Sequence, residues 1–193
     1  MRSVGLPHEP PWDEPIDVAS VVAEAPASVT TKGLFLTGLA DQIVGAGGER
    51  PGSWVAFADY PVREYIQLLA DCAAYCHPEL SLGRAIRRVG NTAYPTFAAT
   101  TLGRVIFAFA GKDPKAALRL APRAYQVVSA GTSEVTLEEG DRVDVLRMRD
   151  IYSFAELHEV GVIEGGIRQF GGDVHVRVFV HGPGAVDLHV HWT

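Results

Sequence analysis

The sequence contains few of the residues that mark disulfide-rich, membrane-spanning or nucleic-acid-binding proteins. Of its 193 residues only Cys72 and Cys76 are cysteines, and their spacing within a helical pattern is poor geometry for a disulfide. Its most apolar run, residues 96–110, is shorter than the stretch of about 20 residues that a membrane span needs. Lysine and arginine number 17 against 23 acidic residues, and the net charge of −6 disfavours a nucleic-acid partner. Since the N-terminal residues include no apolar leader, we expect a soluble cytoplasmic protein with no membrane span.

Motifs for nucleophilic or phosphate chemistry are also missing. The chain has no G-x-S-x-G elbow, and no G-x-G-x-x-G follows a predicted strand. The glycine-rich loop at residues 45–48 lacks the Lys-Ser/Thr pair of a phosphate-binding loop, so it is interpreted as a linker. We therefore predict no catalytic residues and favour a protein that is not an enzyme.

The composition is that of a folded protein with a sizeable core. Hydrophobic residues make up 47% of the chain and charged residues 21%. Five of the twelve prolines fall before residue 30. Residues 1–29 are therefore predicted to be an extended, proline-rich arm without a helix, with a short strand at 16–22. Residues 30–193 are predicted to form a single domain.

Hydrophobic periodicity predicts helices over much of the first two thirds of this domain. They are expected at residues 31–44, 61–76, 81–93, 96–110 and 114–129. Tyr94-Pro95 should end the third, because a residue before proline avoids the helical region. Asp113 should cap the last, and Pro122 should kink or divide it. Residues 96–110 contain a single charge, that of Arg104, and are therefore predicted to be a buried central helix.

The last forty or so residues of the chain carry the clearest pattern, a helix followed by a hairpin. Ser153 and Glu156 have the spacing of a capping box at the start of this helix. Gly161 and Gly165 lie one turn apart, which suggests close contact with a packed neighbour. The apolar stripe beside them consists of Val160, Ile163, Ile167 and Phe170. Residues 174–192 alternate around a Gly-Pro-Gly turn, as a hairpin does.

A second hairpin is expected just before this helix, at residues 135–138 and 142–148 around Gly140-Asp141. The order of elements is then helices, hairpin, helix and hairpin, with no repeated strand–helix–strand unit. We therefore predict an α+β fold. In it, a helical bundle with a buried central helix packs on a small antiparallel sheet.

Histidines gather on one face of the terminal hairpin, because side chains along a strand alternate between its two faces. Asp187 shares this face, while the valines occupy the other and should meet the core. Imidazole and carboxylate groups are good zinc ligands. The histidine face is thus an alternative metal site, with four candidate ligands: His175, His181, His189 and His191. The other interpretation is a polar or pH-sensitive surface exposed to solvent.

Two charges stand in apolar surroundings and suggest a ligand site. Arg104 is the lone charge of its segment, and Glu164 borders the stripe of the capped helix. Because a buried charge must be paired, the two either approach each other or Arg104 faces a cavity. In the alternative, each side chain extends to the surface. The candidate ligand-binding residues are Phe97, Arg104, Val105, Phe109 and Glu164.

Several blocks in order resemble the DUF2378 family, a myxobacterial paralogous family of unknown function. They read TKGLFLTGL from residue 31, YPVREYIQLL from 60, AYPTFAATTLGR from 93, KDPKAALRLAPRAY from 112 and GVIEGGIRQFGG from 161. The resemblance implies no catalytic or binding residues. The order of elements is also similar to the V4R, Bet3-type and haem-NO-binding group of domains, which enclose a hydrophobic cavity and include dimers. The haem-binding branch carries a Y-x-S-x-R motif that is missing here, so no cofactor is expected.

The leading hypothesis is a regulatory or adaptor domain without enzymatic activity. It would act through a protein partner or a second copy of itself, with a small hydrophobic ligand in an internal cavity. The alternative is a metal-dependent enzyme or metal-binding protein that uses the histidine face with zinc.

Overall fold

The computed structural model describes residues 8–108, 110–130 and 133–193. Phe109, one of the predicted ligand-binding residues, lies outside them. The fold is α+β, as predicted, with helices packed on antiparallel sheets. Its helices are α1 (Val18–Glu24), α2 (Gly33–Gly45), α3 (Val62–Cys76), α4 (Leu82–Ala99), α5 (Thr101–Phe107), α6 (Pro114–Arg119), α7 (Ala121–Val128) and α8 (Val160–Gln169). A π-helical turn, η1 (Ala155–Glu159), leads directly into α8.

Four antiparallel strands form the larger sheet, in the order β4-β5-β7-β6. These strands are β4 (Glu134–Glu138), β5 (Val143–Arg149), β6 (Val174–Gly182) and β7 (Ala185–Trp192). Both predicted hairpins are confirmed. The register places Leu188 beside Leu146 on one side and Val178 on the other, and all three side chains are fully buried. The valines of the terminal hairpin therefore face the core, as the alternation predicted.

Three short strands form a second, smaller sheet, in the order β2-β1-β3. They are β1 (Thr30–Lys32), β2 (Asp59–Pro61) and β3 (Ser129–Ala130). Because β3 follows α7 directly, this sheet joins the end of α7 to the segments that precede α2 and α3. Among the described residues, no helix combines the length and the apolar character that crossing a membrane requires.

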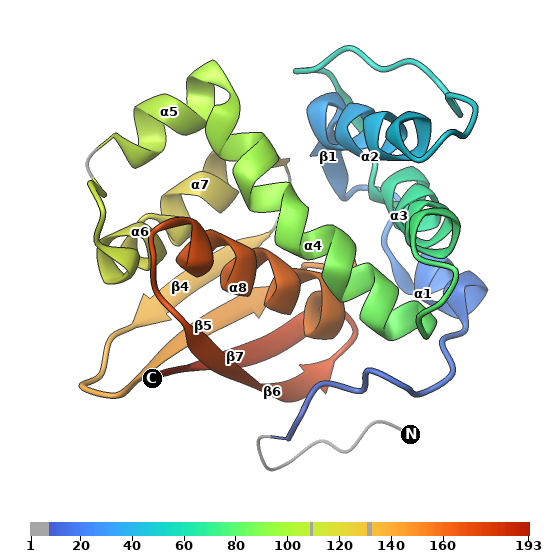
Figure 1. Cartoon of the computed structure of the whole chain (residues 1–193). Coiled ribbons are helices and arrows are strands. Elements are labelled where there is room, and N and C mark those ends of the chain that lie inside the picture. The colour runs from blue at the N-terminus through green and yellow to red at the C-terminus, as the bar shows by residue number, and fades with distance from the viewer. Residues whose placement is uncertain (1–7, 109, 131–132) are drawn as a thin grey trace.

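Among the α-helices of the described residues, α8 has the largest buried share, and it lies between the larger sheet and α4 (Figure 1). Seven of its ten residues are buried. The buried central helix was therefore assigned to the wrong segment. Residues 96–110 are divided by Thr100 into the end of α4 and the short helix α5, and the side chains of Arg104 and Val105 are exposed. Low charge shows that a segment tolerates burial, but the partners that cover it come from elsewhere in the chain.

Helix α4 continues through Pro95 to Ala99, although an end was predicted at Tyr94-Pro95. Proline removes one backbone hydrogen bond and crowds the carbonyl four residues earlier, that of Asn91. Packing on the far side of the proline offsets this cost, because Phe97 is buried against Phe35 and Phe107. The division at Pro122 and the cap of Asp113 on α6 are both confirmed.

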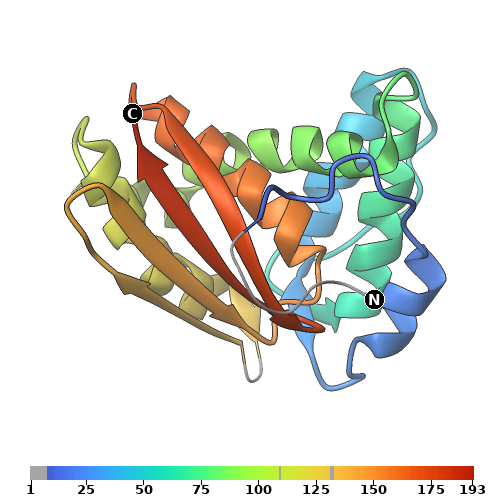
Figure 2. The same ribbon diagram turned by 90° about the horizontal axis from the view of Figure 1, so that it is seen from below.

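The N-terminal arm contains α1, so the predictions that it has no helix and that residues 16–22 form a strand are both wrong. Prolines are absent between Pro15 and Pro26, and the Asp17 carboxylate accepts a hydrogen bond from the Ser20 N–H at 3.1 Å, as an N-cap does. Figure 2 shows the segment before α1 running to the edge strand β6. There the backbone of His8 exchanges two hydrogen bonds of 2.9 Å with Val178. The division into an arm at 1–29 and a domain at 30–193 stays a prediction.

The buried apolar side chains of the described residues form three hydrophobic clusters. A helical cluster is built mainly from α2, α3 and the first half of α4. A sheet cluster joins the inner face of the larger sheet to α8. A third cluster, rich in aromatic side chains, lies among the end of α4, α5 and α7.

Candidate ligand-binding site

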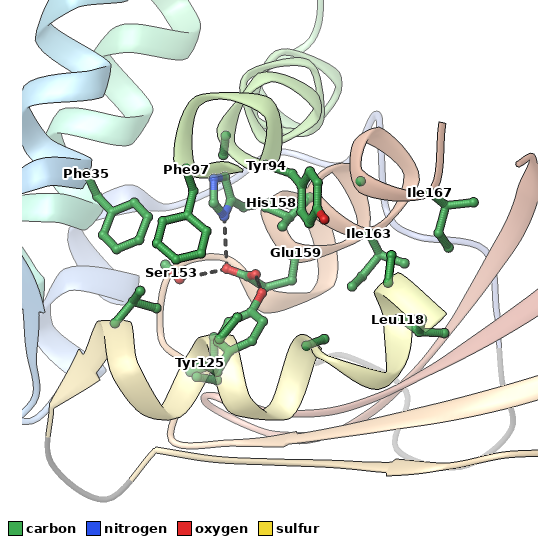
Figure 3. A pocket seen from close by; sticks show the side chains of 18 of the residues that line it. Phe35, Tyr94, Phe97, Leu118, Tyr125, Ser153, His158, Glu159, Ile163 and Ile167 are labelled. Carbon is green, nitrogen blue, oxygen red and sulfur yellow. Dashed lines mark hydrogen bonds and ion pairs between the residues drawn. The ribbon is translucent and has the colours of Figure 1, made fainter. Parts of the chain in front are cut away.

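A cavity of about 130 Å³ lies where the three clusters meet. Helices α4 and α5 form one side, α6 and α7 the opposite side, and η1 with α8 the floor (Figure 3). Single side chains also reach it from α2 and α3, namely Phe35 and Tyr65. The cavity is therefore built from nearly every part of the chain, which explains why no single sequence block marked it.

The two long walls of the cavity differ in chemistry. On the side of α4 and α5 the lining is aromatic, with the rings of Tyr94 and Phe107 4.8 Å apart and those of Phe97 and Phe107 6.2 Å apart. On the side of α6 and α7 it includes three small side chains: Ala117, Ala121 and Ala124. The lining is therefore largely apolar, with rings concentrated on one wall and mainly aliphatic side chains on the other.

Glycines bring α8 close enough to α4 to form the floor of this space. A Cβ atom at Gly165 would lie 2.3 Å from the carbonyl oxygen of Asn91. A Cβ atom at Gly90 of α4 would meet the carbonyl oxygen of His158 at the same distance. Real Cβ contacts are never this short, so only glycine permits this helix crossing. The close contact predicted from Gly161 and Gly165 is confirmed.

Two polar residues of the lining come from η1, which is not the capped α-helix that was predicted. Ser153 and Glu156 do not start a regular helix: Phe154 adopts a left-handed conformation, with φ 54° and ψ 54°, and the chain enters a π-helical turn. Turns of this kind are rare and are frequent at functional sites. Here the turn directs two consecutive side chains, His158 and Glu159, into the cavity lining.

Glu159 is the centre of a buried hydrogen-bond network, and its side chain is 5% exposed. Its Oε1 atom lies 2.9 Å from Nδ1 of His158 and accepts a hydrogen bond from the Ser153 hydroxyl at 3.2 Å. The Tyr125 hydroxyl donates to Oε2. On the other side of the imidazole, Nε2 of His158 lies 3.4 Å from the Tyr65 hydroxyl. The network thus joins groups from three separate segments: α3, α7 and residues 153–159.

Burial has the largest single effect on the pKa of Glu159 and raises it. The charge of His158 and the hydrogen bonds from His158, Tyr125 and Ser153 act in the opposite direction, and together they hold the pKa below its ordinary value. Burial, followed by the negative charge of Glu159, raises the pKa of Tyr65 and Tyr125. At neutral pH the carboxylate therefore accepts hydrogen bonds, and the phenols keep their protons.

Sequence reasoning missed this network, although one signal was available. The dipeptide His158-Glu159 stands in a segment otherwise dominated by apolar residues and glycine. A charged pair in such a segment must find partners inside the protein. The partners, Tyr65 and Tyr125, lie 93 and 34 residues away from the groups they contact, so the sequence gives no indication of them.

The residues that were predicted to bind a ligand do not come together. Phe97 lines the cavity, whereas Arg104 and Val105 are exposed on α5. Glu164 is buried and pairs with Arg87, whose Nε atom is 2.7 Å from its carboxylate. The predicted approach of Arg104 to Glu164 is therefore wrong, because α4 presents a different arginine to α8.

The histidines of the terminal hairpin lie on the outer face of the sheet, as predicted, and two of them pair with acidic residues. His175 is 2.9 Å from Glu9, and His181 is 3.1 Å from Asp187. The rings of His175 and His191 are 6.1 Å apart. In the part of the chain that the structure describes, no three His, Cys, Asp or Glu side chains are placed to hold a metal ion. The arrangement does not support the zinc alternative.

The family of unknown function DUF2378 has a model that matches residues 27–193. The chain belongs to this family. No curated protein matches it. The resemblance that was identified from the sequence blocks is thus confirmed, and the match includes every described residue that lines the cavity.

Solved structures of H-NOX proteins share the fold at low sequence identity. An Fe(II) unliganded H-NOX protein from K. algicida is 12% identical, with a TM-score of 0.62 over 84% of this chain and 96% of that one. An Fe(II)NO form from S. oneidensis is 11% identical, with a TM-score of 0.58 over 84% and 99%. A further H-NOX structure, from work on haem distortion, is 13% identical, with a TM-score of 0.54 over 83% and 92%.

These neighbours overturn the expectation of no cofactor. That expectation relied on the missing Y-x-S-x-R motif, yet proteins that share the fold are haem proteins according to their own descriptions. A missing motif argues against one way of holding a group, but says nothing about other ligands that the same fold encloses.

Proposed function

We propose that this member of the DUF2378 family is a regulatory domain that binds a small, largely apolar ligand in the cavity between α4–α5, α6–α7 and α8. The observation that carries the proposal is the cavity itself, where apolar walls surround a small number of convergent polar groups. The likeness to H-NOX structures supports it, since it shows the same fold in proteins described as haem-containing.

Haem is the first ligand to test against these residues, and it does not fit the described lining. The lining residues that the structure describes include no lysine or arginine to meet the propionates, and they place the Glu159 carboxylate inside the cavity. His158 is the one described histidine in the lining, and both of its ring nitrogens face protein partners. A cavity of about 130 Å³ is close in size to an engineered one of about 150 Å³ that binds benzene. The proposal is therefore for a smaller ligand.

A regulatory domain must pass the effect of ligand binding to another molecule. Contact with another protein or with a second copy of the chain would do this. Two large side chains in the loop before β2 support this idea, since Val55 is 69% exposed and Phe57 66%. Exposed apolar groups of this size are typical of interaction sites when they cluster. The cytoplasmic location favoured by composition belongs to the same proposal.

Native mass spectrometry of untagged protein tests both parts, because one spectrum reports subunit number and retained ligand. Binding of toluene, followed by thermal unfolding, tests the cavity directly, since a ligand that binds only the folded state raises Tm. We expect Ala124→Phe, which fills the cavity, to abolish the increase in Tm. The matched control Ala74→Phe, on the exposed face of α3, should keep it. An equal response in both variants would contradict the proposal.

A haem titration is the second arm of this experiment. Stoichiometric haem binding, followed by the Soret band and lost in His158→Ala, would overturn the choice of a small ligand. Weak, non-saturating absorbance that is unchanged in His158→Ala is the expected result.

A further inference from the structure

The hydroxyl of Tyr94 is a buried polar group at the cavity wall. Its Oη atom is shielded from solvent and has no hydrogen-bond partner among the described residues. Figure 3 shows this hydroxyl directed toward the other lining side chains, away from the backbone of α4. A phenolic hydroxyl can donate one hydrogen bond and also accept. A buried hydroxyl without a partner is costly, so a polar group in the cavity would relieve that cost.

Helix α8 and two neighbouring rings hold the side chain of Tyr94 in place. A Cβ atom at Gly166 would lie 2.9 Å from its ring, so α8 leaves no room for the ring to swing toward the floor. The rings of Phe107 and Phe170 pack against it at 4.8 and 6.0 Å between centroids. The hydroxyl is therefore held at one place in the cavity, as a recognition group must be.

The charge of a ligand is restricted by the network at Glu159. Both oxygens of this carboxylate already accept hydrogen bonds, from Ser153 and Tyr125, and Oε1 also faces His158. An anionic ligand would add a second negative charge to a buried site. A cationic ligand would have to share a carboxylate whose oxygens already serve Ser153, Tyr125 and His158. A charged ligand would thus lose its hydration for at most a shared partner, so an uncharged ligand is favoured.

The size and the lining of the cavity restrict the ligand further. One wall includes the rings of Phe97 and Phe107, which can pack against the ring of a ligand. A volume of about 130 Å³ leaves room for a molecule about the size of a single six-membered ring.

From these observations we infer that the ligand is a small, uncharged ring compound with one hydroxyl or carbonyl group, which hydrogen-bonds to Tyr94. This inference depends on the proposed function, because it names the class of ligand for the same cavity. The apolar walls would contact the ring of the ligand, and the Tyr94 hydroxyl would bind its oxygen atom.

Three probes that share a tolyl ring test the inference: p-cresol, toluene and p-toluate. Calorimetric titration of the full chain should give a Kd for p-cresol about five-fold lower than that for toluene, the effect of one neutral hydrogen bond. The p-toluate anion should bind at least about ten-fold more weakly than p-cresol. Equal affinity for p-cresol and toluene, or tighter binding of p-toluate, would overturn the inference.

Tyr94→Phe removes the hydroxyl and keeps the ring. In this variant the preference for p-cresol over toluene should disappear, while the Kd of toluene stays within about two-fold of its original value. The matched control is Tyr75→Phe, which removes a hydroxyl from a half-exposed residue outside the cavity and should keep the preference. A preference that survives Tyr94→Phe would show that Tyr94 is not the recognition group.

Failure of the proposed function would look different. If neither toluene nor p-cresol binds to the original chain, and Ala124→Phe changes nothing, the cavity is not a ligand site and both conclusions fall. If toluene binds and Ala124→Phe blocks it, the proposed function stands, and only the comparison with p-cresol decides the ligand class.

Discussion

Gly161 of α8 lies directly against the backbone of Arg87 in α4. A Cβ atom at position 161 would be 2.2 Å from the Arg87 carbonyl oxygen and 3.1 Å from the amide nitrogen of Asn91. The same stretch of α4 supplies Arg87 to Glu164, one turn further along α8. The contact between α4 and α8 that Gly161 permits therefore also places Arg87 beside the buried carboxylate of Glu164.

Gly161→Ala should destabilise the protein by about 2–3 kcal/mol, because the methyl group must push α8 away from α4. The free energy of unfolding in urea, followed by circular dichroism, measures this effect. Gly45→Ala is the matched control, since no atom lies within 4 Å of a Cβ at the end of α2. It should be neutral or stabilise by up to about 1 kcal/mol. Similar losses in both variants would contradict the close crossing.

Arg87→Leu should destabilise the protein by about 1–3 kcal/mol, because it leaves the carboxylate of Glu164 buried without its ion-pair partner. This range lies below that of a fully buried pair, since the Arg87 side chain is 35% exposed. Adding Glu164→Gln should recover part of the loss, because a neutral amide costs less to bury. Arg119→Leu, which breaks an exposed pair with Glu139, should cost less than about 0.5 kcal/mol.

The acid sensitivity of the fold should depend on Glu159. Its pKa in the folded chain is lower than its ordinary value of 4.5, so its charge stabilises the fold above that pH. The contribution is lost as the pH falls through the folded pKa, because the unfolded state then binds the proton more readily. The stability difference between the original chain and Glu159→Gln should be constant above about pH 5 and decrease below 4.5. Urea unfolding at several pH values measures it, and a difference that grows in acid would contradict the assignment.

Phe154 stores backbone strain, because a bulky residue in the left-handed region costs about 1–2 kcal/mol. Both Phe154→Ala and Phe154→Gly lose a buried ring, but glycine should be the more stable of the two by about 1 kcal/mol. At Leu157, which is equally buried and has no positive φ, the order should be reversed. Unfolding free energies of the four variants check this prediction.

The two thiols should differ in reactivity. Burial, with a smaller effect from the neighbouring Cys76, raises the pKa of Cys72 to about 12. A disulfide reagent at pH 8 should therefore modify Cys76, which is partly exposed, and leave Cys72 unmodified in the folded chain. Cys76→Ala should abolish the fast reaction. Rapid reaction of Cys72 in that variant would show that its helix opens.

The predictable elements are those whose evidence lies within a few residues. Alternation of valines fixed which face of the terminal hairpin is buried, and Asp113-Pro114 marked the start of α6. Gly161 and Gly165, one turn apart, predicted the close contact of α8 with a neighbouring helix. Each of these patterns depends on backbone geometry that neighbouring residues share, so no knowledge of distant parts was needed.

The errors have one origin. Residues 96–110 are largely apolar, which predicted burial. No other segment of the described chain packs over Val105, however, and its side chain is 62% exposed. Glu164 needed a cation, for which we predicted Arg104, whereas Arg87 pairs with it. Pro95 is a helix breaker locally, and aromatic packing around Phe97 outweighs it.

By itself the sequence determined the fold class, the hairpins, the family and the apolar character of the interior. The tertiary structure decided which helix became central, which arginine meets Glu164 and how His158-Glu159 is held. The physical reason is that side-chain patterns report which face of an element avoids water. A buried charge or a cavity depends instead on groups from several segments, and only the assembled chain brings those together.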